Sequence, residues 1–189
     1  MNDPDAELMI RFQEGDTNAF QQLYERYKTK MINYCYRFIG RQAVAEELAQ
    51  EVLIRVYRAA AAYRPEARFS TWIFKIATNV CLKEVRKKEY RAHHVSLEAP
   101  RGENGEQPLD PPDIRTQPPD RLLENRERMD RIHRALNTLP PRQKAALLLS
   151  TFERFSYAEI AGQIGRTESS VKSLIYRARR QLAAVLIDK

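Results

Sequence analysis

The residues best suited to chemistry lie in one stretch, residues 59–91, where cations alternate with aromatic and amide side chains. Asn79, Lys83 and Arg86 follow the spacing i, i+4 and i+7, so they share one face of a helix. That face offers an amide for a base edge and cations for phosphates. Aromatic residues gather just ahead of it, at Tyr63, Phe69, Trp72 and Phe74. Aromatics interleaved with cations suit a surface that binds unstacked single-stranded bases. A cationic amphipathic helix with its aromatics in the core is the simpler alternative.

A helix must position these side chains, and the sequence predicts one over Ser70–Tyr90. Ser70 or Thr71 supplies an N-cap oxygen for the first turn. Ile73, Ile76 and Val80 then recur at helical spacing as an apolar stripe.

A second candidate site lies near the end of the chain. Ser156–Glu159 has the pattern of a capping box, a short helix follows, and Gly165 supplies a turn. Thr167 caps the next helix, which is expected to run to about Leu186. A short helix, a glycine turn and a second helix are typical of the DNA-binding helix-turn-helix.

The faces of that second helix sort by polarity when ~100° is allowed per residue. One side is apolar and comprises Val171, Leu174, Ile175, Ala178 and Leu182. The opposite side comprises Ser169, Lys172, Ser173, Tyr176, Arg177 and Arg180. Its first members lie near the helix N-terminus, where recognition helices meet base edges. A solvated charged face is the alternative interpretation.

The remaining patterns are also helical, and no stretch alternates like a strand. Helices are predicted up to Gly15, from Asp16 to Gly40, and over about 43–62. Further helices are predicted over 121–137 and from Pro141. We therefore expect an all-α protein of two helical domains, residues 1–92 and 121–189, the second containing the helix-turn-helix.

Residues 93–120 differ in composition from both domains. They hold six of the ten prolines and six acidic residues against Arg101 and Arg115. Such a segment cannot bury a core and is expected to be a flexible, acidic, proline-rich linker. His93 and His94 at its start are expected to be exposed and without a role.

Composition limits the classes of function. The 189 residues carry a net charge of +7, which favours a polyanionic partner such as nucleic acid. No apolar run could span a bilayer and no signal pattern is present. We therefore expect a cytoplasmic location and no membrane insertion. Cys35 and Cys81 lie within helical patterns and are expected to be buried thiols. No metal site, cofactor or catalytic carboxylate pair is predicted.

Two other functional classes compete with a non-catalytic protein that binds nucleic acid through both candidate sites. One is a transcription regulator with an N-terminal sensing domain, although such a domain does not need the aromatic-basic stretch. The other is an enzyme acting on nucleic acid, which the absence of a metal-ligand cluster disfavours.

Motifs in both blocks resemble the extracytoplasmic-function (ECF) sigma factors of bacterial RNA polymerase. In the first block they are Gly15-Asp16, Ala19-Phe20, Ala45–Val52, Phe69–Ile73 and Ile76–Asn79. In the second they are Leu139–Arg142, Ser156–Ala161 and Val171–Arg179. Their order, around an intervening linker, is more specific than any single motif.

The resemblance implies a subunit that binds core polymerase at its clamp helices and flap, recognises promoter DNA and is inhibited by an anti-sigma factor. It implies polymerase contacts by Glu47, Gln50, Glu51, Ile54, Arg55 and Arg58. It implies minus-ten contacts and melting by Tyr63, Arg64, Phe69, Ser70, Thr71, Trp72, Lys75, Asn79, Lys83, Arg86 and Lys87. It implies minus-thirty-five contacts by Arg166, Ser169, Ser170, Lys172, Ser173, Tyr176, Arg177 and Arg180. Glu47, Ser169-Ser170 and Leu174 depart from the residues most frequent in the family. The change at Glu47 is mild, whereas Ser169-Ser170 and Leu174 leave the promoter sequence open.

Overall fold

The computed structural model describes residues 3–95 and 130–187, and within these ranges the chain is helical with no strand. The elements are α1 (Pro4–Gln13), α2 (Thr17–Ile39), α3 (Gln42–Ala59), the short 3-10 helix η1 (Ala60–Ala62), α4 (Phe69–Val95), α6 (Pro141–Thr151), α7 (Tyr157–Ile164) and α8 (Glu168–Ile187). Residues 130–137 are also helical and precede α6. The prediction of an all-α fold is confirmed.

The predicted linker falls almost entirely outside the described residues, and so does the start of the helix predicted from Arg121. Its first residues are an exception, because α4 extends to Val95 and therefore includes the backbone of residues 93–95. The side chains of His93 and His94 lie outside the described part.

Most helix ends follow the capping signals in the sequence. The Asp16 carboxylate accepts a hydrogen bond from the Ala19 amide at the start of α2, and Gly40 ends that helix with φ 79°. Ser156 and Glu159 form both halves of a capping box at the start of α7. Gly165 then takes the left-handed conformation, with φ 64°, which a residue without a Cβ adopts at little cost. The turn between α7 and α8 therefore depends on this glycine.

The start of α4 is the exception, and the predicted N-cap at Ser70 or Thr71 is wrong. The helix begins at Phe69, which places both hydroxyl residues inside its first turn. The carboxylate of Asp3 accepts a hydrogen bond from the Phe69 amide at 2.7 Å. Asp3 is also the N-cap of α1. One carboxylate thus serves two helix starts that are distant in sequence.

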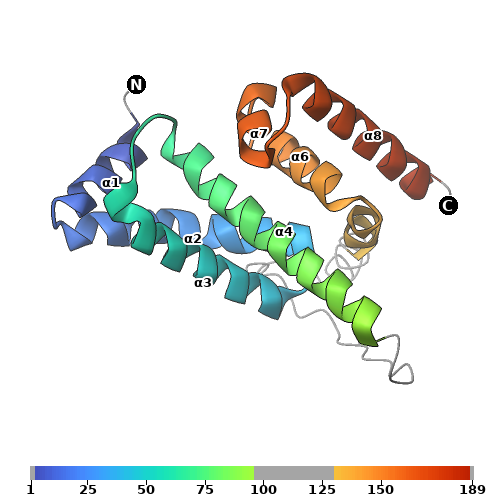
Figure 1. The fold of residues 1–189 in the computed structure, drawn as a ribbon, viewed down its shortest axis with the longest axis horizontal. Coiled ribbons are helices and arrows are strands. Elements are labelled where there is room, and N and C mark those ends of the chain that lie inside the picture. The colour runs from blue at the N-terminus through green and yellow to red at the C-terminus, as the bar shows by residue number, and fades with distance from the viewer. Residues whose placement is uncertain (1–2, 96–129, 188–189) are drawn as a thin grey trace, which may run out of the picture.

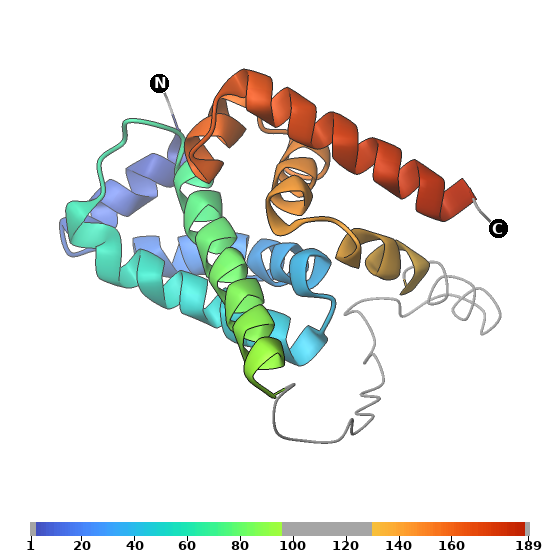
Figure 2. The same cartoon turned by 45° about the vertical axis from the view of Figure 1, so that its right-hand side comes forward.

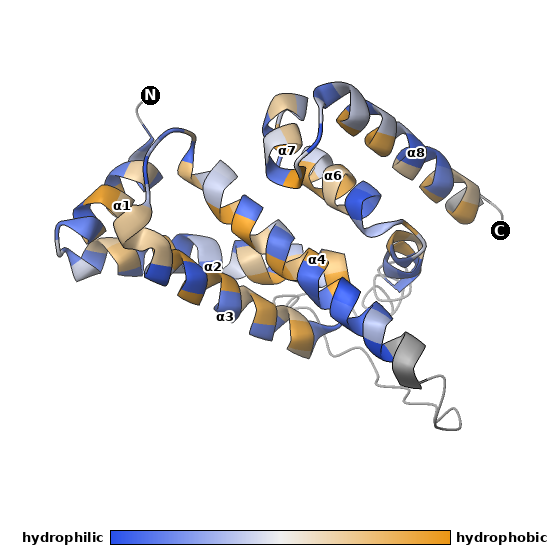
Figure 3. Cartoon of the chain, viewed as in Figure 1, coloured by the Kyte–Doolittle hydropathy of each residue, from blue (hydrophilic) through white to orange (hydrophobic). Residues whose placement is uncertain are grey.

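In the first block α2 packs against α1, α3 and α4, and apolar residues alternate with polar ones along each helix (Figure 3). Its core is rich in large aromatic side chains, and Tyr27, Tyr34 and Phe38 are almost fully buried. Cys35 and Cys81 are buried free thiols, as predicted, and their sulfur atoms lie 3.7 Å apart between α2 and α4. The proximity of the two thiols was not predicted.

The second block lies directly against the first. α6 and α7 run beside α4 in both views, and α8 lies on the far side of them (Figures 1 and 2). The rings of Phe74 and Phe155 meet edge to face at 5.5 Å across this boundary. The guanidinium of Arg37 covers the ring of Phe152 at 4.2 Å. The buried residues of the two blocks consequently form one continuous apolar cluster.

Candidate nucleic-acid interface

One candidate surface is the α4 cationic face, which we define as Lys75, Asn79, Lys83, Arg86 and Lys87. All five side chains are exposed. Buried residues on the other side of the helix fix its rotation, so the predicted sharing of a face is observed. Lys87 forms a peripheral ion pair with Glu84 at 3.9 Å. The surface presents one amide among four cations to solvent.

The loop before α4 differs from the expected aromatic pocket. Tyr63 and Phe69 are only 2% and 0% exposed, and their rings pack together with the half-buried Trp72. Burial raises the pKa of the Tyr63 hydroxyl to about 12. Gln13 of α1 donates hydrogen bonds to the carbonyls of Ala60 and Tyr63 at 2.6 and 3.1 Å, which anchors the loop. Two of the residues expected to touch a base are therefore part of the core that supports the loop.

The outward face of α8 is the second candidate surface, and the structure places it as the helical angles predict. Lys172, Ser173, Tyr176 and Arg177 line a shallow hollow that is open to solvent. Arg180 approaches the ring of Tyr176 at 5.9 Å. The remaining predicted members, Arg166 and Ser169, are exposed, and Ser170 is half-buried.

The position of α8 is fixed by contacts on its inner side. Val171, Ile175 and Ala178 are buried against α6 and α7. Gln181 also donates a hydrogen bond to the Thr138 carbonyl at 2.9 Å, which ties α8 to the end of the helix at residues 130–137. These contacts hold the cationic face outward.

A third surface lies on α3 and carries the predicted polymerase contacts. Glu47, Gln50, Ile54 and Arg58 are exposed, and Glu51 is paired with Arg55 one turn later. Ile54 is 50% exposed.

Tyr57 is a neighbour of this surface that was not predicted from the sequence. Its ring is 55% exposed and contacts Phe12 and Phe20 at 5.2 and 5.1 Å. It follows Ile54 by three residues, so helical spacing alone would have placed it on the same face.

The boundary between the blocks brings charged groups together that are far apart in sequence. Arg68, just before α4, forms an ion pair with Glu159 of α7, and the Thr71 hydroxyl donates to the same carboxylate at 3.1 Å. Partial burial raises the pKa of Glu159. Hydrogen bonds from Arg68, Ser156 and Thr71 outweigh that effect and lower the pKa to about 2. Glu159 is therefore anionic at neutral pH, and its pairing with Arg68 of the loop was not predicted from the sequence.

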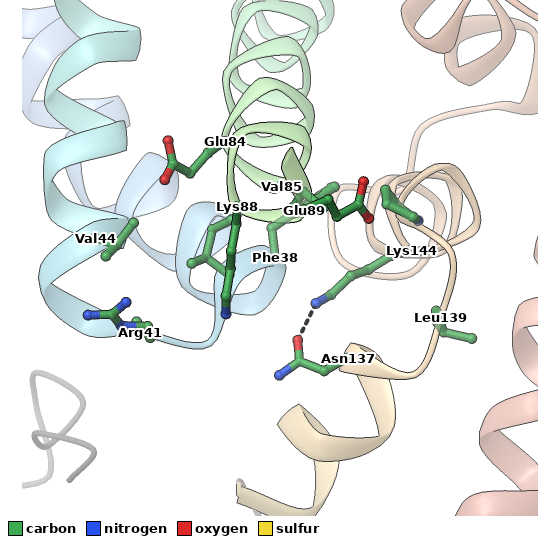
Figure 4. A pocket seen from close by; sticks show the side chains of 12 residues that line it. Phe38, Arg41, Val44, Glu84, Val85, Lys88, Glu89, Asn137, Leu139 and Lys144 are labelled. Atoms are coloured by element: carbon green, nitrogen blue, oxygen red, sulfur yellow. Dashed lines mark hydrogen bonds between the residues drawn. The ribbon is translucent and has the colours of Figure 1, made fainter. Parts of the chain in front are cut away.

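A pocket of about 290 Å³ lies farther along the same boundary, between the ends of α2 and α4 and the start of α6 (Figure 4). Lys144 enters it from α6 and donates a hydrogen bond to the Asn137 side chain at 2.8 Å. Burial lowers the pKa of Lys144 to about 8. The lining combines Arg41, Lys88 and Lys144 with Glu84 and Glu89, so it favours neither sign of charge.

No group of three or more His, Cys, Asp or Glu side chains within 3–95 and 130–187 is placed to hold a metal ion. Among the helices of these ranges, none is both long enough and apolar enough to cross a membrane.

Comparisons with known proteins match both blocks separately. Residues 23–91 match the family model described as Sigma-70 region 2, and residues 129–182 match Sigma-70, region 4. The chain is 31% identical over 182 residues to the RNA polymerase sigma-H factor of Pseudomonas aeruginosa, covering 96% of this chain and 93% of that protein.

Two other curated relatives are longer than this chain. The chain is 32% identical over 186 residues to the ECF RNA polymerase sigma factor BldN of Streptomyces coelicolor, covering 96% of the chain and 66% of BldN. It is 34% identical over 185 residues to the ECF RNA polymerase sigma factor SigG of Mycobacterium tuberculosis, covering 90% of the chain and 49% of SigG. The chain thus spans between half and two thirds of the length of these two relatives.

Solved structures share the fold. One is CnrH in complex with the cytosolic domain of CnrY, with a TM-score of 0.71 and 21% identity over 99% of this chain and 100% of that chain. Another is the sigma factor RpoE of Bartonella quintana in complex with the anti-sigma factor NepR. Its TM-score is 0.69 and its identity 20%, over 90% of this chain and 98% of that chain. At these identities the likeness concerns the arrangement of helices.

Proposed function

The chain belongs to the ECF sigma factors of bacterial RNA polymerase, and we propose that it binds the core enzyme and directs it to specific promoters. The observation that carries this proposal is the presence of two exposed cationic faces in one chain. One is the α4 cationic face and the other is the outward face of α8, in the order of the region 2 and region 4 matches. A regulator that binds a single DNA site needs only one such face.

The two faces differ in ways that suit different forms of DNA. If the amide of Asn79 binds the Watson–Crick edge of a base, that base must be extruded, because this edge is occupied in an intact duplex. Lys83, Arg86 and Lys87 would bind the adjoining backbone. We assign the melted minus-ten element to α4 and the duplex minus-thirty-five element to α8, where Lys172 and Arg177 lie near the N-terminal half of the helix.

The burial of Tyr63 and Phe69 changes the details of this assignment. Both would act by holding the loop in place, while Arg64, Trp72 and Lys75 would contact the strand directly. Melting requires unstacking energy of a few kcal/mol per base step, which base capture and phosphate contacts would offset. No step of this process needs covalent chemistry, so we assign the protein a non-catalytic role. Since its proposed partners are RNA polymerase and promoter DNA, we also assign it a cytoplasmic location.

The exposed face of α3 is the proposed docking site for the polymerase clamp helices. Exposed Ile54 and Tyr57 give it an apolar centre, and Glu47, Gln50 and Arg58 surround this centre with polar groups. An apolar centre with a polar rim is the usual anatomy of a protein interface. Residues 1–92 and 121–189 would act as separate promoter-binding domains that residues 93–120 connect. An anti-sigma factor would be a further partner of the protein.

Run-off transcription tests the proposed function. Purified core polymerase, with and without this protein, is supplied with a library of bacterial promoters. The expected result is transcription from a defined subset of promoters only when the protein is present. Transcription that is unchanged by the protein on every promoter, together with no binding to core polymerase, would overturn the proposal.

A further inference from the structure

A carboxylate from one block occupies a cationic site on the other. Oε1 of Glu159 is held by the Arg68 guanidinium, just before α4, and by the Thr71 hydroxyl in the first turn of α4. Oε2 accepts hydrogen bonds from the amide and hydroxyl of Ser156, within the capping box of α7. The carboxylate thus links the loop of the first block to the helix-turn-helix of the second.

The surrounding hollow combines cations of the first block with two carboxylates, one of which is that of Glu159. Arg64, Thr71, Trp72 and Lys75 line it from the first block, and α7 closes it from the other side. Gln163 of α7 also lines the hollow; it is 4% exposed, and neither atom of its amide has a hydrogen-bond partner in the described part of the chain. A buried amide without a partner costs free energy, which a polar ligand in the hollow would recover. Glu66 is the other acidic residue of the lining.

Guanidinium and hydroxyl groups bind a carboxylate and a phosphate with similar geometry. We propose that Arg68 and Thr71 form a phosphate site for the minus-ten strand, and that Glu159 fills this site while the two blocks are packed together. This inference rests on the proposed function. DNA and Glu159 compete for the same cation, so the packed form of the protein binds the minus-ten strand less tightly than a form in which α7 has moved away.

Because DNA and Glu159 compete for Arg68, substitutions of these two residues should have opposite effects on binding of the minus-ten strand. Glu159→Gln removes the charge and keeps the start of α7, because Gln also serves as the third residue of a capping box. It should tighten binding of a fluorescent single-stranded minus-ten oligonucleotide by about two- to fivefold, the range for an ion pair of this exposure. Arg68→Gln breaks the same pair and should weaken binding. It should also lower the salt dependence by about 0.7 in slope, as expected for one lost contact to a single strand.

A matched control and a second readout are available. Glu66→Gln removes the same charge from the same hollow without breaking the pair, so it should tighten binding much less than Glu159→Gln. Trp72 is the only tryptophan of the chain and lies in the hollow, so its emission should shift to longer wavelength in Glu159→Gln. Thr71→Val, which changes no charge, should weaken binding.

The outcomes separate this inference from the proposed function. If Glu159→Gln and Arg68→Gln change binding in the same direction, or if Glu66→Gln matches Glu159→Gln, the shared phosphate site is wrong. Run-off transcription by the unaltered protein tests the proposed function independently, since it does not depend on whether Glu159 competes with DNA.

Discussion

At the scale of single residues, exposure separates the side chains that can bind DNA from those that support them. Asn79 is exposed in the middle of the α4 cationic face, whereas Thr78 beside it is fully buried and hydrogen-bonded to Tyr34 at 2.8 Å. Tyr63 and Phe69 belong to the supporting class despite their positions in an aromatic-basic loop. Substitutions in the two classes should therefore affect different measurements, DNA binding in one case and stability in the other.

Asn79→Ala should impair strand opening on duplex promoters more than initial closed binding, because the amide contacts a base only after that base is extruded. Permanganate footprinting beside fluorescence-measured binding checks this, on duplex and premelted bubble templates. The bubble should rescue only the opening part of the defect, since the captured base still lacks its partner. Asn18→Ala, an exposed asparagine on α2, is the matched control. Normal opening of the duplex by Asn79→Ala would remove Asn79 from the mechanism.

Lys144 should make the stability of the protein vary with pH in the alkaline range. Its pKa is lowered from 10.5 to about 8, mainly by burial. Between these values the unfolded chain retains a proton that the folded chain has released, so the contribution of Lys144 to the free energy of unfolding rises with pH. Below pH 8 the buried charge destabilises the fold.

Lys144→Met should therefore raise the free energy of unfolding at pH 7 by about 1–3 kcal/mol, and the gain should fall as pH rises from 8 to 10.5. Urea titrations at several pH values measure the difference between variant and parent. The exposed Lys172→Met serves as the control and should show no such trend. A difference independent of pH would contradict the assigned pKa of Lys144.

At the scale of elements, each amphipathic helix keeps one face in the core and leaves the other exposed. On α8 the buried Val171, Ile175 and Ala178 leave the cationic side outward. On α3 the buried Leu48, Val52 and Val56 leave outward a face that includes an exposed isoleucine and tyrosine. The function proposed for each helix can therefore be tested by comparing a substitution on its outward face with a matched substitution elsewhere on the exposed surface.

Arg177→Ala should cost about 1–3 kcal/mol of promoter affinity, concentrated at one position of the minus-thirty-five element, if its guanidinium contacts a base edge. Arg179 is the matched control, because it is also exposed on α8 but lies about 160° farther round the helix from Arg177. Binding assays on a set of single-base promoter variants give the positional profile. A uniform loss across all sequences would make Arg177 a phosphate contact instead.

The double change Gln50→Ala and Glu51→Ala should weaken binding to core polymerase while leaving the helical content unchanged. Both side chains lie on the outer half of α3, and alanine favours a helix more than either of them. Gln21→Ala with Glu25→Ala makes the same chemical change on the exposed face of α2. Pull-down titrations and circular dichroism compare the two pairs. Equal affinity of both double variants for the polymerase would refute the docking assignment.

At the scale of the whole molecule, the two blocks form one packed body within the described residues. Phe74 against Phe155, Arg37 over Phe152 and Arg68 with Glu159 join them. Engagement of two promoter elements would require the blocks to separate, because α7 covers part of the beginning of α4. The packed and separated forms are therefore expected to differ in DNA affinity.

Phe152→Ala should shift the protein toward the separated form, since a cation–π contact of this kind contributes about 0.5–2 kcal/mol. Small-angle scattering should show a larger radius of gyration for the variant than for the parent. Tyr176→Ala also removes an exposed aromatic ring of the second block, but one that faces away from the boundary with the first. It should leave the radius unchanged, and equal radii for all three proteins would contradict the prediction.

The sequence by itself determined the elements and their exposed faces. Helical periodicity, the capping box at Ser156 and the glycine at Gly165 depend on neighbours within a few residues, so local chemistry was enough to predict them. The sorting of Val171 and Arg177 to opposite sides of α8 followed from helix geometry in the same way. The family resemblance followed from the order of such local motifs.

Only the tertiary structure decided which residues from distant segments meet. Asp3 replaces Ser70 as the cap of α4 because the start of α1 folds next to it. Tyr63 and Phe69 become core residues because α2 supplies a ring, that of Tyr27, for Phe69 to pack against. Arg68 meets Glu159 across 91 residues of chain. Periodicity and capping patterns describe neighbours along a helix, whereas these contacts depend on how helices pack, and that packing follows from the apolar surface of the whole chain.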